Sequence, residues 1–132
     1  MDPNPTPQQN DEEARSEAEN LEIQAAKAAA GIAYKVLRIT VPDLDDEDKP
    51  GRALAFRRPN DSEWHRYRSE ALDPNPQTKA RALHSIVIPC CLYPARAEFL
   101  RLVAERPGLV ELCGGELVEF AGLVRAKKVE RQ

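Results

Sequence analysis

Apolar and polar side chains alternate in two short segments in the first half of the chain. In residues 33–41 (AYKVLRITV) successive side chains would lie on alternate faces of a strand, and β-branched residues are concentrated at the end of the segment. Residues 53–57, ALAFR, are also extended in character, and Pro59 disfavours helical geometry at Arg58. The acidic, proline-containing stretch PDLDDEDKPG lies between them. The pattern predicts a β-hairpin with a solvated loop, which needs helices to pack against.

After Pro59 the apolar residues recur at helical spacing. Asn60 can cap a helix, and Glu63 three residues later completes a capping box, with Trp64, Tyr67 and Ala71 on one face. Asn75 followed by Pro76 is a second start signal, and the helix that follows carries Ala80, Leu83, Val87 and Cys90. Pro89 lacks a backbone N–H, so we expect it to kink this helix or to end it just before Cys90.

Two more helices complete the predicted fold. One runs from Pro94 to Glu105 and presents Phe99, Leu102 and Val103 to the core. The other covers residues 109–120, with Gly114 and Gly115 as a weak point or a close-packing site and Gly122 as a C-terminal cap; its apolar stripe is Leu109, Leu112, Cys113, Leu117 and Phe120. We therefore expect an α+β fold, mainly α, in which an N-terminal β-hairpin packs on a bundle of about four helices in a single domain over residues 31–122.

The two ends of the chain differ from this domain. Residues 1–13 are polar, acidic and proline-rich, which predicts a disordered arm. Residues 14–30 are rich in helix formers and predict an Ala-rich helix with a thin apolar side: Leu21, Ala25, Ala28 and Ile32. Residues 123–132 are basic and are expected to fray.

Charge is distributed unevenly along the 132 residues. The net charge is −3; residues 1–30 hold seven acids and two bases, or −5, and residues 31–132 hold fifteen acids and seventeen bases, or +2. A near-neutral domain lacks the strong cationic footprint of a nucleic-acid binder. No signal peptide and no apolar run of roughly 18 residues is visible, so we expect a cytosolic protein without a membrane span. Its three cysteines are then expected to be reduced and mostly buried.

Candidate chemistry is sparse. Neither His65 nor His84 has a sequence relation to Cys90 or Cys91 that specifies a catalytic pair. A metal site built from His84, Cys90 and Cys113 is conceivable, but the spacing of structural zinc ligands is missing. The acidic run from Asp43 to Asp48 lacks the glycine and the closing glutamate of a calcium loop, and no phosphate-binding glycine motif is present. We expect neither an enzyme nor a cofactor or metal.

One basic cluster keeps a second interpretation open. Arg57, Arg58, Arg66 and Arg68 accompany Trp64 and Tyr67, a combination that also occurs in single-stranded nucleic-acid binders. On a helix, however, the two aromatic residues share a side, which favours core anchors with arginines at the rim. A small nucleic-acid-binding regulator therefore remains an alternative to an interaction module built of amphipathic helices.

The order of three motifs resembles a known family. These are the step AFRRPND after the second strand, the stretch ALHSIVIPCCLYP, and the final EFLRLVAERPGLVELCGGELVEFAG. Over residues 34–122 the chain is similar to the tail assembly chaperones of long-tailed bacteriophages. The resemblance implies a non-enzymatic protein of the infected bacterial cytoplasm that binds the long helical tape measure protein, recruits tail tube subunits and leaves before the tail is complete. Many such chaperones also occur as a longer, frameshifted form.

The resemblance also directs attention to surfaces that could hold an apolar partner helix. We expect Ile88, Leu92 and Tyr93 to contact the partner, because the break at Pro89 should expose part of that apolar stretch, with Phe99 and Leu117 as secondary candidates. The same residues could equally belong to the core. A structural virion protein, such as a head-tail connector or a tail terminator, is a further alternative, and homo-oligomerisation stays open.

Overall fold

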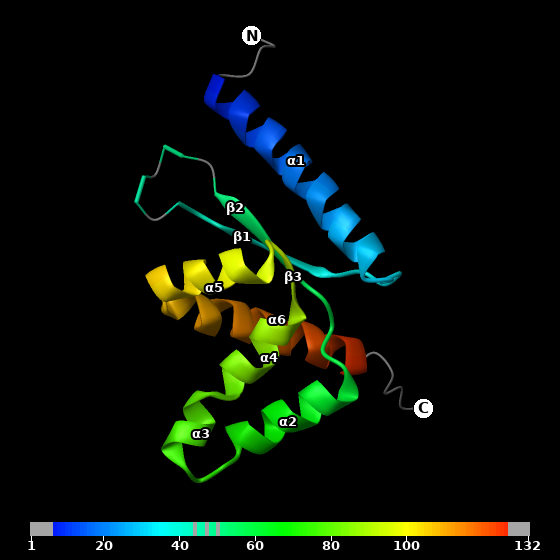
Figure 1. The fold of residues 1–132 in the computed structure, drawn as a ribbon, viewed down its shortest axis with the longest axis vertical. Coiled ribbons are helices and arrows are strands. Elements are labelled where there is room, and N and C mark those ends of the chain that lie inside the picture. Colours follow the sequence, from blue (N-terminus) through cyan, green and yellow to red (C-terminus); the bar gives the residue numbers. More distant parts are fainter. Residues whose placement is uncertain (1–6, 44, 47, 50, 127–132) are drawn as a thin grey trace.

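The fold is a small antiparallel sheet between helices (Figure 1). The computed structural model describes residues 7–43, 45, 46, 48, 49 and 51–126. The elements in chain order are α1 (Pro7–Ala29), β1 (Leu37–Val41), β2 (Arg52–Phe56), α2 (Asp61–Ala71), α3 (Pro76–Ala80), α4 (Ala82–Cys90), β3 (Cys91–Tyr93), α5 (Arg96–Glu105) and α6 (Gly108–Ala126). The expected α+β class, mainly α and with a β-hairpin, is confirmed.

The sheet has the strand order β1-β2-β3, with both pairs antiparallel. The hairpin register joins Leu37 to Phe56 and Val41 to Arg52. The third strand, β3, was not predicted from the sequence: it follows α4 directly and pairs only with the end of β2, where Ala55 lies opposite Tyr93. Three residues are too few to show a period, so only the partner strand reveals this segment as a strand.

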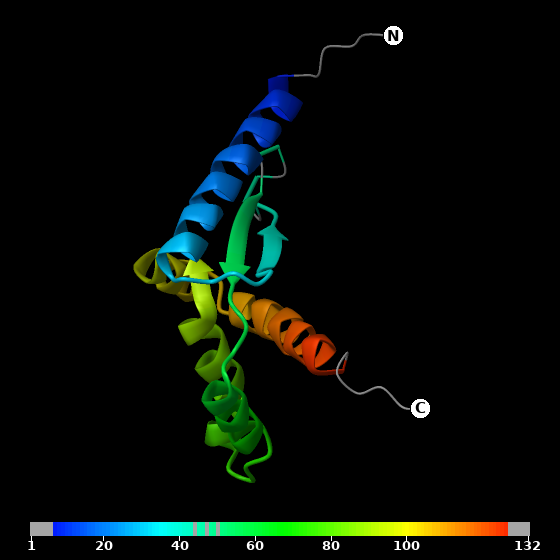
Figure 2. The ribbon, with the colours of Figure 1, turned by 90° about the vertical axis from the view of Figure 1, so that its right-hand side faces the viewer.

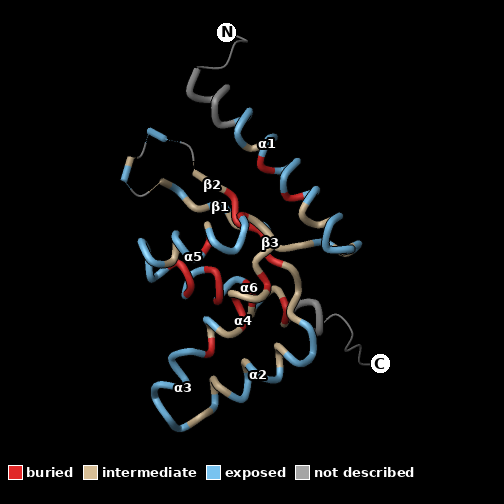
Figure 3. Tube along the Cα trace, in the orientation of Figure 1, coloured by how far each residue is buried: buried red, intermediate tan, exposed pale blue. Residues whose placement is uncertain are grey.

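The two faces of β2 pack against different helices. Leu54 and Phe56 point into the main core, which α4, α5 and α6 close; its buried members appear as red segments in Figure 3. There the rings of Phe56 and Phe99 meet edge to face, with centroids 5.6 Å apart. Ala53 and Ala55 point to the opposite face, where they contact Ile23 of α1. Figure 2 shows α1 and α6 on opposite sides of the strands.

Small side chains decide how closely α1 approaches the sheet. Ala53 and Ala55 are fully buried under α1, and Ile23 is the one large apolar residue of this helix in that cluster. Leu21 is 72% exposed, and Ala25 and Ala28 are also exposed. The prediction that Leu21, Ala25 and Ala28 form the buried side of this helix was therefore wrong. The helix turns Ile23 and the carboxylate of Glu19 to the strands instead, because a β-branched residue and a buried hydrogen bond outweigh several alanines.

Several element boundaries differ from the prediction. Residues 7–13 are helical and extend α1, since they contain good helix formers and Pro7 occupies the first helical position; residues 1–6 of the predicted disordered arm lie outside the described residues. The predicted helix after Asn75 is two helices with Arg81 between them. Pro89 lies inside α4, which ends at Cys90. Helix α6 continues through Gly122, so this glycine is not a cap, and residues 127–132 of the predicted basic tail lie outside the described part of the chain.

Local signals in the second half are well supported. The side chain of Asn60 accepts a hydrogen bond from the Glu63 amide, and the Glu63 carboxylate accepts one from the Asn60 amide, which confirms the capping box. Gly114 is the predicted close-packing site, because a Cβ there would lie 2.8 Å from Leu83 Cδ2 of α4, whereas Gly115 faces open space.

Candidate partner-binding site

Two of the five expected contact residues belong to the core. Phe99 and Leu117 both have 0% relative exposure and pack in the main cluster with Phe56 and Leu54. They present no surface to a partner, which corrects the expectation that they contact one. The helical stripes on which they lie face the sheet and α4, and the sequence pattern alone does not separate such a stripe from a docking face.

The other three candidates are partly buried. Ile88 packs against the main core cluster, and Leu92 and Tyr93 lie with Ala53 and Ala55 beneath α1. The stretch is partly exposed, because Ile88, Leu92 and Tyr93 are each of intermediate burial, and the chain enters β3, which pairs with β2, directly after α4. Burial and the nearby carboxylate of Glu22 raise the pKa of Tyr93 to about 12. Ile88 packs on the core and Leu92 and Tyr93 pack between the sheet and α1, and their contact with a partner stays a prediction.

The three thiols have raised pKa values. Burial raises the pKa of Cys90 to about 12, of Cys91 to about 11 and of Cys113 to about 12. At neutral pH they are therefore protonated, whereas nucleophilic attack requires the thiolate. Both histidines are exposed. Among the described residues no group of three or more His, Cys, Asp or Glu side chains is placed to hold a metal ion.

Most of the predicted basic cluster is paired within the protein. Arg57 binds Glu63 through two hydrogen bonds of 2.8 Å and also reaches the Pro89 carbonyl at 3.1 Å. Arg58 stacks on the Tyr34 ring at 3.7 Å, and Arg66 pairs with Glu70 at 2.9 Å. Two of the four arginines, Arg57 and Arg66, are thus paired with carboxylates. Arg58 and Arg68 keep their charge, so the nucleic-acid alternative stays a hypothesis.

The arginine pair has a structural role. Arg57 follows β2, Glu63 lies in the first turn of α2 and Pro89 lies in α4, so their contacts join three elements. The Arg57 guanidinium is the main reason that the pKa of Glu63 is lowered. Trp64 and Tyr67 are partly buried against the main core, as the interpretation of core anchors predicts.

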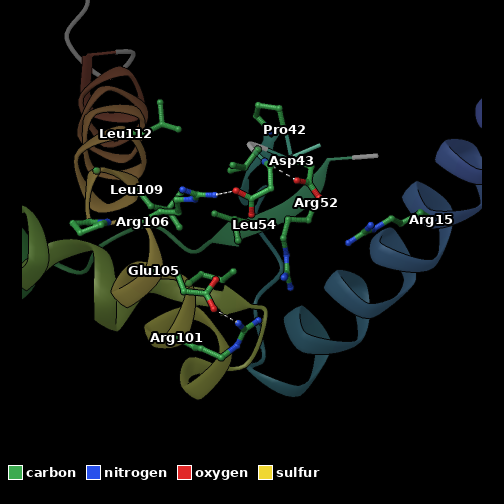
Figure 4. A pocket seen from close by; sticks show the side chains of 15 residues that line it. Arg15, Pro42, Asp43, Arg52, Leu54, Arg101, Glu105, Arg106, Leu109 and Leu112 are labelled. Carbon is green, nitrogen blue, oxygen red and sulfur yellow. Dashed lines mark hydrogen bonds and ion pairs between the residues drawn. The ribbon is translucent and has the colours of Figure 1, made fainter. Parts of the chain in front are cut away.

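A cavity of about 660 Å³ lies where the hairpin, α5 and α6 meet, with α1 at its side (Figure 4). This size falls in the usual range for ligand sites. Its apolar wall comes from the hairpin and from both helices: Val41, Pro42, Leu54, Leu102, Leu109 and Leu112. Leu54 and Leu109 form the buried part, whereas Leu112 is 50% exposed and stands at the opening. A half-exposed leucine beside an apolar cavity is a surface that a partner side chain can cover.

Charged side chains surround the apolar wall. Arg101 pairs with Glu105 at 2.6 Å, and Arg106 pairs with Asp45 across the opening. Asp43 accepts hydrogen bonds from the amides of Asp45 and Asp46 at 2.9 and 3.0 Å, and the pKa of its carboxyl is lowered, chiefly by the Asp45 amide. The hairpin loop, predicted as a solvated tip, thus borders the cavity on one side.

Sequence reasoning placed Leu112 on the core stripe of the last helix and did not find this site. One signal was present: Leu109, Leu112 and Cys113 cannot all face inward to the same extent, because residues three and four apart are separated by about 60 and 40 degrees on a helix. The positions of α5 and the hairpin determine which of these three residues lies at the edge of the core, and these positions are set by the tertiary structure.

The fold and the site define a small α+β domain with a mixed apolar and charged cavity. The chain belongs to the family described as Domain of unknown function (DUF6848), which matches residues 26–130 and so includes the sheet, α2 to α6 and most of the cavity wall. No curated protein and no solved structure matches the chain. None of the described helices combines the length and the apolarity that crossing a bilayer requires.

Proposed function

We propose that this protein is a non-enzymatic assembly chaperone that holds an apolar segment of a partner protein in the cavity between the hairpin, α5 and α6. The observation that carries the proposal is Leu112: it is 50% exposed at the opening of a cavity whose inner wall is Leu54, Leu102 and Leu109. Covering an exposed leucine with a partner's apolar side chain removes apolar area from water on both sides, at about 25 cal/mol per Å².

The shape of the site suits an amphipathic helix of the partner. Such a helix presents apolar residues one turn apart, with polar residues on its flanks. The leucines would receive the apolar residues, and the charged groups around them, such as Arg101 and Asp45, would face the polar flanks. A mixed rim of this kind restricts which segments can dock, because unpaired charges disfavour the wrong partner.

The resemblance to phage tail assembly chaperones names the partner class. We propose that the segment belongs to a tape measure protein, whose long helices expose apolar stripes before the tail is built, and that tail tube subunits join the complex later. The site of action would be the cytoplasm of the infected bacterium. The raised thiol pKa values support a binding role over covalent catalysis, since the cysteines lack thiolate character.

The proposal can be tested by co-expression with the tape measure protein encoded in the same genome. The soluble yield of the tape measure protein and its co-purification with the chaperone would be measured for the unaltered chain, for Leu112→Glu and for the matched control Leu72→Glu. Leu72 is 76% exposed at the end of α2, away from the cavity, so the control places the same charge on another exposed leucine. We expect Leu112→Glu to lose co-purification and Leu72→Glu to retain it.

Two outcomes would contradict the proposal. A tape measure protein whose solubility does not change on co-expression would remove the chaperone function. Equal co-purification by both variants would show that the partner does not use the cavity. Mass spectrometry of purified mature particles separates the remaining alternative, because a structural virion protein stays in the particle and a chaperone leaves it.

A further inference from the structure

We infer that the cavity also contains a receptor for a carboxylate, formed by Arg15, Arg52 and Arg101, and that the partner segment carries an acidic residue next to its apolar ones. The inference rests on the proposed function for the nature of the partner, and it goes beyond it by assigning the chemistry of one partner residue. It is carried by incompletely paired cationic groups, above all the buried Nε of Arg52 and the exposed guanidinium of Arg15, which are separate from the leucine wall.

Three guanidinium groups from three elements converge beside the apolar wall. Arg15 comes from α1, Arg52 from the start of β2 and Arg101 from α5, and all three line the same cavity. Figure 4 shows their side chains reaching from different directions toward one region. Like charges brought together from distant parts of a chain raise the free energy of the folded state unless anions lie among them. Comparing the cationic donors of the cavity with its anionic acceptors therefore shows whether the site has room for a further anion.

Only one of the three arginines is well paired. Arg101 binds Glu105 at 2.6 Å and Glu98 at 3.0 Å. Arg52 shares Glu98 but reaches it only at 3.4 Å, near the limit for a hydrogen bond, and its Nε atom is buried with no acceptor among the described residues. A buried donor without an acceptor is unfavourable, so Arg52 lacks one of the hydrogen bonds that it could make. Arg15 makes no hydrogen bond with a described residue, and its charge partner among those residues is the Asp43 carboxylate, whose pKa it helps to lower.

The carboxylates of the lining already have donors. Asp45 pairs with Arg106, Glu105 pairs with Arg101, and Asp43 accepts two backbone amides. Among the described lining residues, the groups that can still accept a further partner are therefore cationic, Arg52 and Arg15 in particular. A ligand that completes the site brings an anion, and the fork of an arginine matches the two oxygens of a carboxylate.

The neighbouring side chains select a single carboxylate on an aliphatic carrier. The wall of Leu54, Leu102 and Leu109 adjoins the arginines, so a ligand that reaches both must join an apolar part to an anionic one. Asp43, Asp45 and Glu105 in the same lining disfavour a polyanion such as a nucleic acid, because each further negative charge would meet one of them. A glutamate or aspartate one helical turn from a leucine meets both requirements.

The test uses two probe peptides and the full chain. Both peptides are blocked, alanine-based helices with two leucines one turn apart; one carries a glutamate beside the leucines and its twin carries glutamine. Affinity is measured by calorimetry, and the site is located by amide and arginine Nε shifts in NMR spectra. We expect the glutamate peptide to bind about ten-fold more tightly than its twin, as one charge-assisted hydrogen-bonded contact allows, and to weaken as salt is raised.

The variants separate a contact from a structural effect. Arg15→Gln is chosen because Arg15 is exposed and because Asp43, its charge partner among the described residues, is also held by two backbone amides. It should remove most of the preference for glutamate and leave the glutamine peptide unaffected, since only the former pairs with Arg15. The control Arg68→Gln removes the same charge from an exposed position on α2 and should retain the preference. Arg15→Lys should restore part of it.

Each remaining outcome is decisive. Equal binding of the two peptides overturns the carboxylate receptor while the chaperone function stands, provided that Leu112→Glu weakens both. Failure of both peptides to bind overturns the receptor for this class of segment, and the tape measure experiment then decides the function independently. Octanoate, a carboxylate on an aliphatic chain, is the small-molecule probe. If octanoate binds more tightly than the glutamate peptide and its affinity depends on Arg15 in the same way, the site binds a free fatty acid. That result would overturn the proposal of a polypeptide ligand.

Discussion

Glu19 of α1 accepts a hydrogen bond of 2.8 Å from the backbone amide of Ala53 in β2. The third strand pairs with β2 only near Ala55 and Phe56, so the amide of Ala53 lies on an edge that β3 does not reach. A buried backbone amide needs an acceptor, and here a side chain from a helix replaces the missing strand. Glu19 and Ile23 therefore both attach α1 to the same face of β2, Glu19 through a hydrogen bond and Ile23 through apolar packing.

The first prediction concerns this contact. Glu19→Ala should lower the free energy of unfolding by about 1–3 kcal/mol, because it leaves a buried amide without an acceptor. Glu19→Gln keeps a side-chain oxygen and should cost less. Urea denaturation followed by circular dichroism gives the stability, and hydrogen exchange of the Ala53 amide reports the contact directly. Glu17→Ala, on the exposed side of α1, is the control; an equal loss in both variants would mean that the contact contributes nothing.

A second prediction follows from the ion pair between Arg57 and Glu63. The pair holds the pKa of Glu63 in the folded protein below its ordinary value of 4.5. The stability that it contributes is therefore fully present above that value and is lost as the pH falls through the lowered pKa. Glu63→Gln should make the unfolding free energy less dependent on pH below about 4.5, and Glu116→Gln, exposed on α6, should leave the dependence as it is. Identical pH profiles in all three proteins would exclude this coupling.

The two adjacent glycines of α6 provide a matched pair. Gly115 faces open space, so Gly115→Ala should stabilise the protein by about 1 kcal/mol, the difference in helix propensity. At Gly114 an added Cβ would meet Leu83, with its Cδ2 at 2.8 Å and its Cβ at 3.2 Å, so Gly114→Ala should lose that gain and destabilise by about 1–3 kcal/mol. Thermal denaturation of both variants measures the difference. Equal stabilisation by both would show that α4 does not pack closely on Gly114.

The cysteines should react slowly in the native state. Because burial raises the pKa of Cys90 and Cys113 to about 12, only a very small fraction is thiolate at pH 8, and access is also restricted. A chromogenic disulfide reagent should modify these thiols far more slowly in buffer than in concentrated denaturant, where all three cysteines should react. Rapid native modification of Cys90, located by mass spectrometry, would contradict the burial and would revive the case for a reactive thiol.

The elements that the sequence predicted correctly depend on local rules. The alternation before Val41, the cap at Asn60 with Glu63, and the start at Asn75 and Pro76 each act within a few residues, so one sequence displays them completely. Errors arose where the partner is distant. Strand β3 exists because β2 offers an edge, and α1 turns Ile23 inward because Ala53 and Ala55 leave room for it.

The same distinction between local signals and distant contacts applies to the candidate site. The α+β class, the hairpin and the helical caps were predictable from the order of residues, because they follow from backbone preferences and short-range periodicity. The packing of the elements, in contrast, makes Phe99 and Leu117 part of the core and leaves Leu112 half exposed. It also brings Arg15, Arg52 and Arg101 into the lining of one cavity. Burial and charge pairing depend on contacts between residues far apart in the chain, and a periodic pattern records which residues are apolar but not which of them another element covers.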